Sequence, residues 1–335
     1  MDPRSTRSPR PSRLPRTRLT RGAAAAALAA ALVAGAAACA DEEGPAAGDP
    51  LASAVDPGSL EPPVTVEPGP APEVRLLEPG SGARRVLAYA PSREPAVVAV
   101  TRSGSARTAV PGTEPRTDDT PEQTLTVEGS AEPDVDGAQR AAVEVRAFTS
   151  VDERRAAQFA TAPGFTVTWT RGADGVVRRI ALEAPAGATD AARAGVEITA
   201  NAVSAATVVW PREAIGEGAR WAVTRRVDDA VAPTRVTTYE LTALDGDVAT
   251  VRLTTSAPDT APTLTAPAAD GGPGVTLRVD TYDVTGTGEL TVDLRAALPV
   301  AGRTESSTRA VYSDPGTGTR TTYDEDSVLG FDRAG

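Results

Sequence analysis

Several residue types on which much enzyme chemistry depends are missing or nearly missing from this 335-residue sequence. It contains no histidine and no lysine, so every basic side chain is an arginine, and Cys39 is its one cysteine. Serine or cysteine nucleophiles in their usual form need a histidine, and Schiff-base and Ser-Lys mechanisms need a lysine. Zinc, copper, haem and iron–sulfur sites lack their usual ligands. We therefore expect no catalytic residue, no metal site and no cofactor.

The side-chain chemistry that remains uses carboxylates, hydroxyl groups, arginine and tyrosine. A carboxylate pair of the glycosidase type is the main enzymatic alternative. Asp228 with Asp229, and Asp280 with Asp283, are the candidate pairs, but nothing in the sequence brings either pair together. The acidic segments 134–137 and 324–326 are not followed by a full twelve-residue calcium loop. We expect these two segments to be solvated turns.

One uncharged, alanine-rich run lies near the start of the chain, at residues 23–38. Seven arginines and one acidic residue precede it, which is the pattern of an export signal. The run is too short to span roughly 30 Å of hydrocarbon comfortably. The sequence therefore predicts a signal peptide at residues 1–38.

The residues before Cys39 are Ala36, Ala37 and Ala38. They resemble the lipobox of bacterial lipoproteins, although leucine is usual where Ala36 stands. The resemblance implies that Cys39 receives diacylglycerol, becomes the first mature residue and anchors the chain to the outer face of the cell membrane. Ordinary cleavage after Ala38 is the alternative, and it would leave a free thiol in an oxidising compartment.

Charge and composition divide the mature chain. Without residues 1–38, 27 arginines stand against 44 acidic residues, a net charge of −17. This charge argues against binding nucleic acid or anionic headgroups, so membrane contact is expected through diacylglyceryl-Cys39 alone. Residues 39–73 are proline-rich and acidic and read as a disordered tether. We expect a first β half with a helix at 74–209 and a second β half at 210–335.

The hydrophobic pattern predicts a mainly β, α+β fold: a curved antiparallel sheet or half-barrel with one long helix packed on it. Alternating strands are expected at 140–149, 165–171, 176–183, 218–227, 234–244 and 248–256. We expect loops at 102–121 and 257–274 and a hairpin turn at 285–288. The helix is expected at 190–209, with Thr189 or Asp190 as N-cap. Its apolar stripe is expected to be Ala191, Ala194, Ile198, Ala202, Ala205 and Val209.

Two pairs of matching segments indicate a degenerate two-fold repeat. The motif GxGAR occurs at residues 80–84 and again at 216–220, and residues 172–185 likewise match 286–299 in the order turn, strand and proline. The second GxGAR motif, with Trp221 after it, the segment TTYELTALDGDVATV and the G-x-G strand at 286–294 resemble an uncharacterised family of actinobacterial lipoproteins, a domain of unknown function. In layout alone, the chain is also similar to LolA-like half-barrels, whose members include lipid-carrier lipoproteins.

These observations favour a non-enzymatic, membrane-anchored extracytoplasmic lipoprotein that binds a hydrophobic ligand, such as a lipid, or a cell-envelope partner. The carrier hypothesis predicts a cavity between helix and sheet, lined by Ile198, Ala202, Val209, Val223 and Leu241. A structural or interaction scaffold without a cavity is one alternative. A carboxylate-based hydrolase is the other.

Overall fold

The computed structural model describes residues 62–334, apart from residue 228 and residues 267–273. The predicted signal peptide, Cys39, Asp228 and most of the predicted tether therefore lie outside the described residues. None of the helices in the described part is long and apolar enough to cross a membrane.

The described strands form a 14-stranded, curved antiparallel sheet that does not close, which confirms the predicted mainly β fold. One side of the sheet contains, from its edge inward, β1 (Val64–Val66), β8 (Val177–Glu183), β7 (Thr166–Arg171), β6 (Gln139–Ser150), β5 (Arg116–Pro133) and β4 (Ser92–Ala109). The other side continues with β16 (Arg320–Arg333), β15 (Ala301–Ser313), β14 (Val275–Asp293), β12 (Val248–Ser256), β11 (Thr234–Asp245), β10 (Arg220–Arg226) and β2 (Glu73–Glu78).

The two sides of the sheet meet at the pairing of β4 with β16, which runs from Val98 opposite Arg333 to Ala109 opposite Thr322. The short strand β13 (Thr263–Ala266) adds to β14. Strand β2 is the exception to the division by sequence, because it follows β1 in the chain but pairs with β10 at the opposite edge. The chain therefore touches both free edges of the open sheet within its first described residues.

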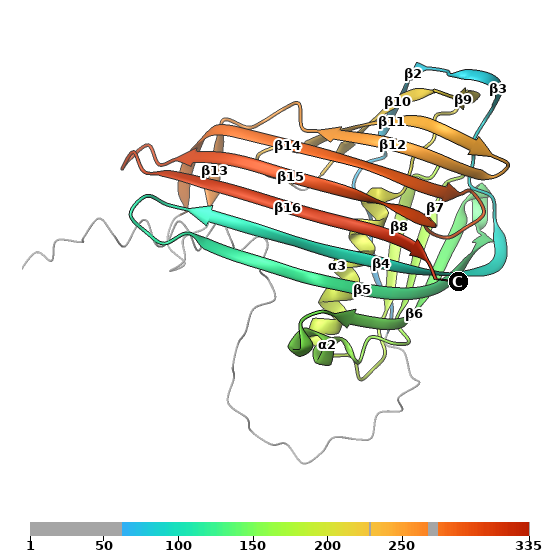
Figure 1. Cartoon of the computed structure of the whole chain (residues 1–335), viewed down its shortest axis with the longest axis horizontal. Helices are drawn as coiled ribbons and strands as arrows, with labels where there is room; N and C mark the ends of the chain where they lie inside the picture. The colour runs from blue at the N-terminus through green and yellow to red at the C-terminus, as the bar shows by residue number, and fades with distance from the viewer. Residues whose placement is uncertain (1–61, 228, 267–273, 335) are drawn as a thin grey trace, which may run out of the picture.

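The long helix α3 (Asp190–Ala206) lies inside the curve of the sheet, behind the broad wall of long strands in Figure 1. Its predicted start is confirmed, because the Thr189 hydroxyl accepts a hydrogen bond from the Ala192 N–H at 3.2 Å. The chain leaves the helix at Thr207, and the Arg225 side chain donates to the carbonyls of Ala205 and Thr207 at this end. The short helix α2 (Glu153–Phe159) packs beside it.

The predicted apolar stripe of α3 is wrong by about one residue. Ile198 is 43% exposed and Ala205 is exposed. The side chains that face the sheet belong mostly to the residues one position further along the chain. The buried residues of the helix are Ala192, Gly195, Val196, Thr199, Ala200 and Val203. Small residues in this row let the stacked rings of Phe148 and Phe159 approach Gly195, where a Cβ would lie 2.5 Å from Phe148.

The two GxGAR motifs lie against each other. Strand β3 (Ser81–Arg85) pairs antiparallel with β9 (Ile215–Glu217) in a separate two-stranded sheet. A Cβ on Gly80 would lie 2.3 Å from the Gly216 carbonyl oxygen, and a Cβ on Gly216 would lie 2.1 Å from that of Ser81. Close backbone approach therefore explains the two glycines, and the matching segments are partners in space.

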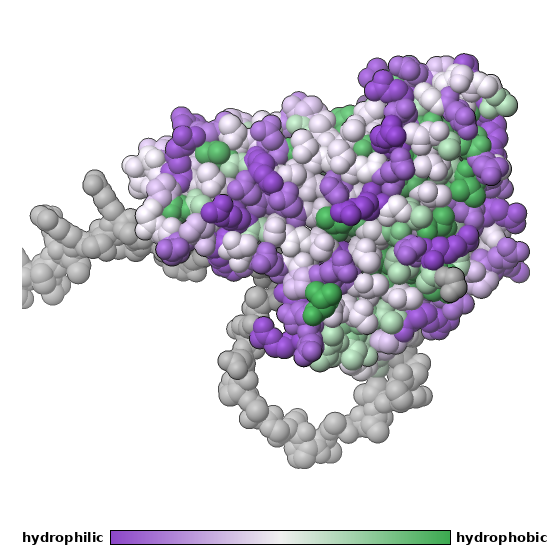
Figure 2. Space-filling view, viewed as in Figure 1, coloured by the Kyte–Doolittle hydropathy of each residue, from purple (hydrophilic) through white to green (hydrophobic). Residues whose placement is uncertain are grey.

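The predicted turn at 285–288 and loop at 102–121 are wrong. Residues 285–288 lie within the continuous strand β14, and residues 102–109 and 116–121 extend β4 and β5. Gly288 is needed for close contact between strands, since a Cβ there would meet the Arg303 carbonyl oxygen at 2.6 Å. The long strands face solvent with hydrophilic and neutral side chains, as Figure 2 shows.

Candidate functional site

The opening of the curved sheet is crossed by a short connection. Strand β1 pairs with β8 at one edge, β2 pairs with β10 at the other, and residues 67–72 join them. We call residues 67–72 the strap. Its sequence, EPGPAP, holds three prolines, which fix φ and limit its flexibility. The strap lies at the end of the segment predicted to be a disordered tether, so the ordered fold begins earlier than expected.

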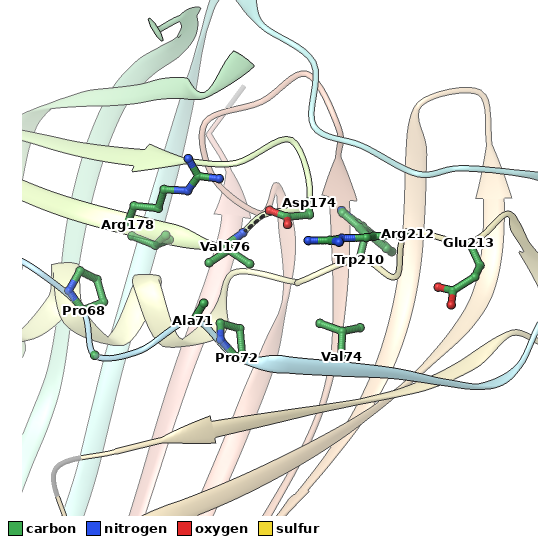
Figure 3. Close-up of a pocket in the computed structure, with 12 residues that line it drawn as sticks. Pro68, Ala71, Pro72, Val74, Asp174, Val176, Arg178, Trp210, Arg212 and Glu213 are labelled. Carbon is green, nitrogen blue, oxygen red and sulfur yellow. Dashed lines mark hydrogen bonds between the residues drawn. The ribbon is translucent and has the colours of Figure 1, made fainter. Parts of the chain in front are cut away.

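A cavity of about 550 Å³ lies beneath the strap. Its walls come from the strap and β2, from the turn and first residues of β8, and from the segment that follows α3 (Figure 3). The lining residues are Pro68, Gly69, Ala71, Pro72, Val74, Asp174, Val176, Val177, Arg178, Trp210, Arg212 and Glu213. This volume falls within the roughly 300–1,000 Å³ of small-molecule sites.

The turn between β7 and β8 positions the floor of this cavity. Gly175 has φ +86°, and a Cβ there would lie 2.2 Å from the Val208 carbonyl oxygen. The turn therefore lies directly against the segment after α3, and the backbone N–H of Trp210 donates to the backbone carbonyl of Asp174 at 2.9 Å. Only glycine allows both the positive φ and this contact. Residues 172–175, which separate the two strands predicted at 165–171 and 176–183, form this turn and support the site.

Charged and apolar groups share the cavity. The strap, Val74, Val176 and Trp210 supply apolar surface, and four charged side chains stand around it. In Figure 3 the guanidinium groups of Arg178 and Arg212 point toward the Asp174 carboxylate, which lies between them, and Glu213 points away. Neither arginine forms an ion pair or hydrogen bond with any residue that the structure describes. Both guanidinium groups therefore keep their donors available.

Trp210 adds a buried polar group to the site. Its side chain is 1% exposed, and its indole Nε1 has no hydrogen-bond partner within the described part of the chain. The ring stands in a row of aromatic side chains, with centroids 6.3 Å from Tyr89 and 5.5 Å from Trp221. Trp221 in turn stacks on Tyr239 at 5.3 Å. This row makes one wall of the cavity part of the hydrophobic core.

The residues predicted to line a ligand cavity do not lie around this one. Val209, Val223 and Leu241 are buried in the core, Ala202 is half-buried, and Ile198 is exposed. The gap between α3 and the sheet is only about 10 Å³, and none of the five residues lines it. Its walls are Val100, Leu125, Val127, Val143, Val167, Trp169, Thr199, Ala200, Val203 and Leu298. Helix and sheet therefore pack closely in this structure.

The carboxylate of the candidate residue Asp229 accepts four hydrogen bonds. It accepts from the Val231 and Ala232 N–H groups at 2.8 and 2.9 Å, from Arg235 at 2.7 Å and from the Tyr282 hydroxyl at 2.9 Å. Burial by itself would raise the pKa of Asp229, but these bonds outweigh it and hold the pKa below its usual value. The carboxylate therefore stays ionised at neutral pH.

Asp280 has a similar environment, with Arg278 at 2.7 Å, Ser313 at 3.0 Å and Arg320 at 3.6 Å. Partial desolvation opposes these contacts, but the net pKa of Asp280 is also lowered. No interaction in the described structure joins Asp280 to Asp283. A glycosidase acid needs a raised pKa, so neither Asp229 nor Asp280 suits that role.

The two acidic segments also have structural roles. Asp134 caps a 3-10 turn (Val135–Gly137) by accepting from the Val135 N–H at 2.9 Å. The prediction of a turn at 324–326 is wrong, because this segment is the middle of strand β16. Arg309 pairs there with Asp324 at 3.3 Å and Asp326 at 2.9 Å. Among the described residues, no group of three or more acidic, cysteine or histidine side chains is arranged to hold a metal ion.

The cavity residues come from three parts of the chain that are far apart in the sequence, so no local motif predicts the cavity. The one sequence signal was Trp210-Pro211-Arg212-Glu213, directly after the helix, together with the glycine turn at 172–175. The similarity to a lipoprotein family stays a prediction, because a comparison with protein-family models finds no match and a comparison with curated proteins finds none either.

Proposed function

We propose that this chain is a lipid-anchored, extracytoplasmic binding protein that takes a small, partly apolar ligand in the cavity beneath the strap. The observation that carries this proposal is the cavity of about 550 Å³ itself, with its apolar walls and two arginines that have no partner among the described residues. The close packing of α3 moves the proposed site away from the helix–sheet interface and toward the sheet edges.

A binding role also agrees with the chemistry of the chain. Histidine and lysine are absent from the sequence, and the two best-placed candidate carboxylates have lowered pKa values and arginine partners. A non-enzymatic function therefore remains the proposal. The membrane anchor is proposed from Ala36-Ala37-Ala38-Cys39, and residues 40–66 would then link this anchor to the strap.

Native mass spectrometry of the chain extracted from its own membranes tests the ligand site. We expect a bound small molecule on the wild type and its loss from Ala71→Trp, since Ala71 is an exposed residue of the strap that lines the cavity. Ala83→Trp, at an exposed position on β3 outside the cavity, is the matched control and should keep the ligand. Equal spectra for wild type and Ala71→Trp would count against the site.

The anchor is tested separately by growing cells with a radioactive fatty acid. We expect the label on the wild type and not on Cys39→Ser. Equal labelling of both would reject lipidation at Cys39 and leave the ligand site untouched.

A further inference from the structure

We propose that the ligand of the cavity beneath the strap is a monoanionic amphiphile, a molecule with one carboxylate or phosphodiester group and an apolar body. This inference rests on the proposed function and adds the chemical class of the ligand. Three observations carry it: the charges around the cavity, the geometry of the arginines, and the apolar walls.

Three charged groups that face one another at the cavity carry one net positive charge, while Glu213, which also lines the cavity, makes the whole lining neutral. Arg178 and Arg212 contribute two guanidinium groups that face the same space, and Asp174 contributes one carboxylate between them (Figure 3). The Oδ1 atom of Asp174 is already an acceptor for the Val176 N–H at 3.1 Å, so this carboxylate also serves the turn. Glu213 lies apart from this group in Figure 3. A ligand whose single negative charge lies at the arginines balances the charge of the three facing groups.

The arginine side chains are suited to a flat or tetrahedral anion. A guanidinium group donates two parallel hydrogen bonds to a carboxylate or a phosphate. Arg178 comes from β8 and Arg212 from the segment after α3, so they reach the space from different walls. Because the Asp174 carboxylate lies between them, a ligand anion has to lie on the cavity side of Asp174 to accept from both arginines. Trp210, whose buried indole N–H has no partner in the described part of the chain, also lines the cavity.

The apolar walls suit a hydrocarbon body. Pro68, Ala71 and Pro72 of the strap lie on the same side of the cavity as Val74, and Val176 lies opposite them. No charged side chain from the strap is among the lining residues. Apolar surface that a ligand buries here favours binding. A ligand that buries its chain beneath the strap and leaves its anion at the arginines uses both parts of the site.

Calorimetric titration of the purified full chain tests the charge requirement, with three ten-carbon probes: decanoate, decanol and decyltrimethylammonium. Decyl methyl phosphate, as a fourth probe, distinguishes a carboxylate ligand from a phosphodiester. We expect one or both anions to bind at least about tenfold more tightly than decanol, and the cation to bind most weakly. Arg178→Gln and Arg212→Gln should each weaken anion binding by about tenfold and leave decanol binding unchanged.

Arg179→Gln is the matched control, because Arg179 is an exposed arginine on β8 that does not line the cavity. Circular dichroism melts show that each variant is folded. If decanol binds as tightly as the anions and Ala71→Trp abolishes it, the monoanion inference is overturned while the ligand site stands. If no probe binds the wild type, or if Ala71→Trp leaves binding intact, the proposed site fails and the inference fails with it.

Discussion

The guanidinium carbon of Arg171 lies 3.8 Å from the centre of the Tyr89 ring, in a cation–π contact inside the hydrophobic core. The two side chains are 2% and 4% exposed. Arg171 forms no ion pair with any carboxylate in the described part of the chain. Its Nη1 and Nη2 atoms donate instead to the carbonyl oxygens of Ala297 and Ala296 at 2.9 and 2.8 Å. Burial raises the pKa of Tyr89 to about 12, so its hydroxyl stays protonated at neutral pH.

Replacing Arg171 with methionine tests whether this contact stabilises the fold. We expect the free energy of unfolding to fall by about 2 kcal/mol, because two buried carbonyl groups lose their donors. Urea denaturation measures the change, and Arg179→Met at an exposed position should stay within about 0.5 kcal/mol of wild type. A more stable Arg171→Met variant would mean that the cost of burying the charge exceeds what its contacts contribute.

Gly175 offers a test of the contact between the β7–β8 turn and the segment after α3. Alanine there meets two obstacles, the positive φ of 86° and the Val208 carbonyl oxygen 2.2 Å from the new Cβ. Gly112 has a similar φ of 83° but open space around its Cβ position. Gly112→Ala should therefore cost only the conformational strain, about 1 kcal/mol.

We expect Gly175→Ala to cost at least about 2 kcal/mol more than Gly112→Ala in urea denaturation, since overpacking adds to the strain. The variant should also bind the cavity ligand more weakly. The turn contains Asp174 and bonds to the backbone of Trp210, so both lining residues shift when the turn moves. Equal costs for the two variants would show that the turn shifts freely.

Asp229 predicts a dependence of stability on acid pH. Burial alone would raise the pKa of Asp229, but its hydrogen bonds lower the folded-state value below that of the unfolded chain. The ionised carboxylate therefore adds stability above the unfolded pKa of about 3.9, and this contribution is lost as the pH falls through the folded-state pKa. We expect Asp229→Asn to be less stable than wild type at pH 7 and the difference to shrink toward pH 3.

Urea denaturation at several pH values measures this difference. Asp283→Asn is the matched control, because Asp283 is exposed on β14 and no hydrogen bond or ion pair joins it to a described residue. Its difference from wild type at pH 7 should stay within about 0.5 kcal/mol. A gap between wild type and Asp229→Asn that is independent of pH would contradict the assigned role of the charge.

Short-range sequence patterns predicted most strands. They failed where a segment rich in glycine and threonine is compatible with both a turn and a strand. The segment Thr285-Gly286-Thr287-Gly288 has the composition of a turn, yet it lies in β14 because a neighbouring strand approaches its backbone closely. Only the partner strand distinguishes these cases, and the sequence does not show which strand that is. The cavity was missed for a similar reason, since its walls meet only after β1 and β2 pair with opposite edges.

The helix shows another limit of the sequence. Seven of the 17 residues of α3 are alanine, distributed around its whole circumference, so the apolar period does not select one face. The larger residues Val196 and Val203 mark the buried row, and Ile198 drew the prediction to the wrong one. The start of α3 was predicted correctly because N-capping is a local interaction.

The orientation of α3 can be tested with substitutions at two positions of one helical turn that face different directions. Val196 is 0% exposed and Ile198 is 43% exposed, although isoleucine is the larger and more hydrophobic side chain. Val196→Ala removes two buried methyl groups and should lower the free energy of unfolding by about 2 kcal/mol. Ile198→Ala should change it by no more than about 0.5 kcal/mol. If Ile198→Ala were the more destabilising of the two, the helix would face the sheet with its other row, and a cavity between helix and sheet would again be the better site for a ligand.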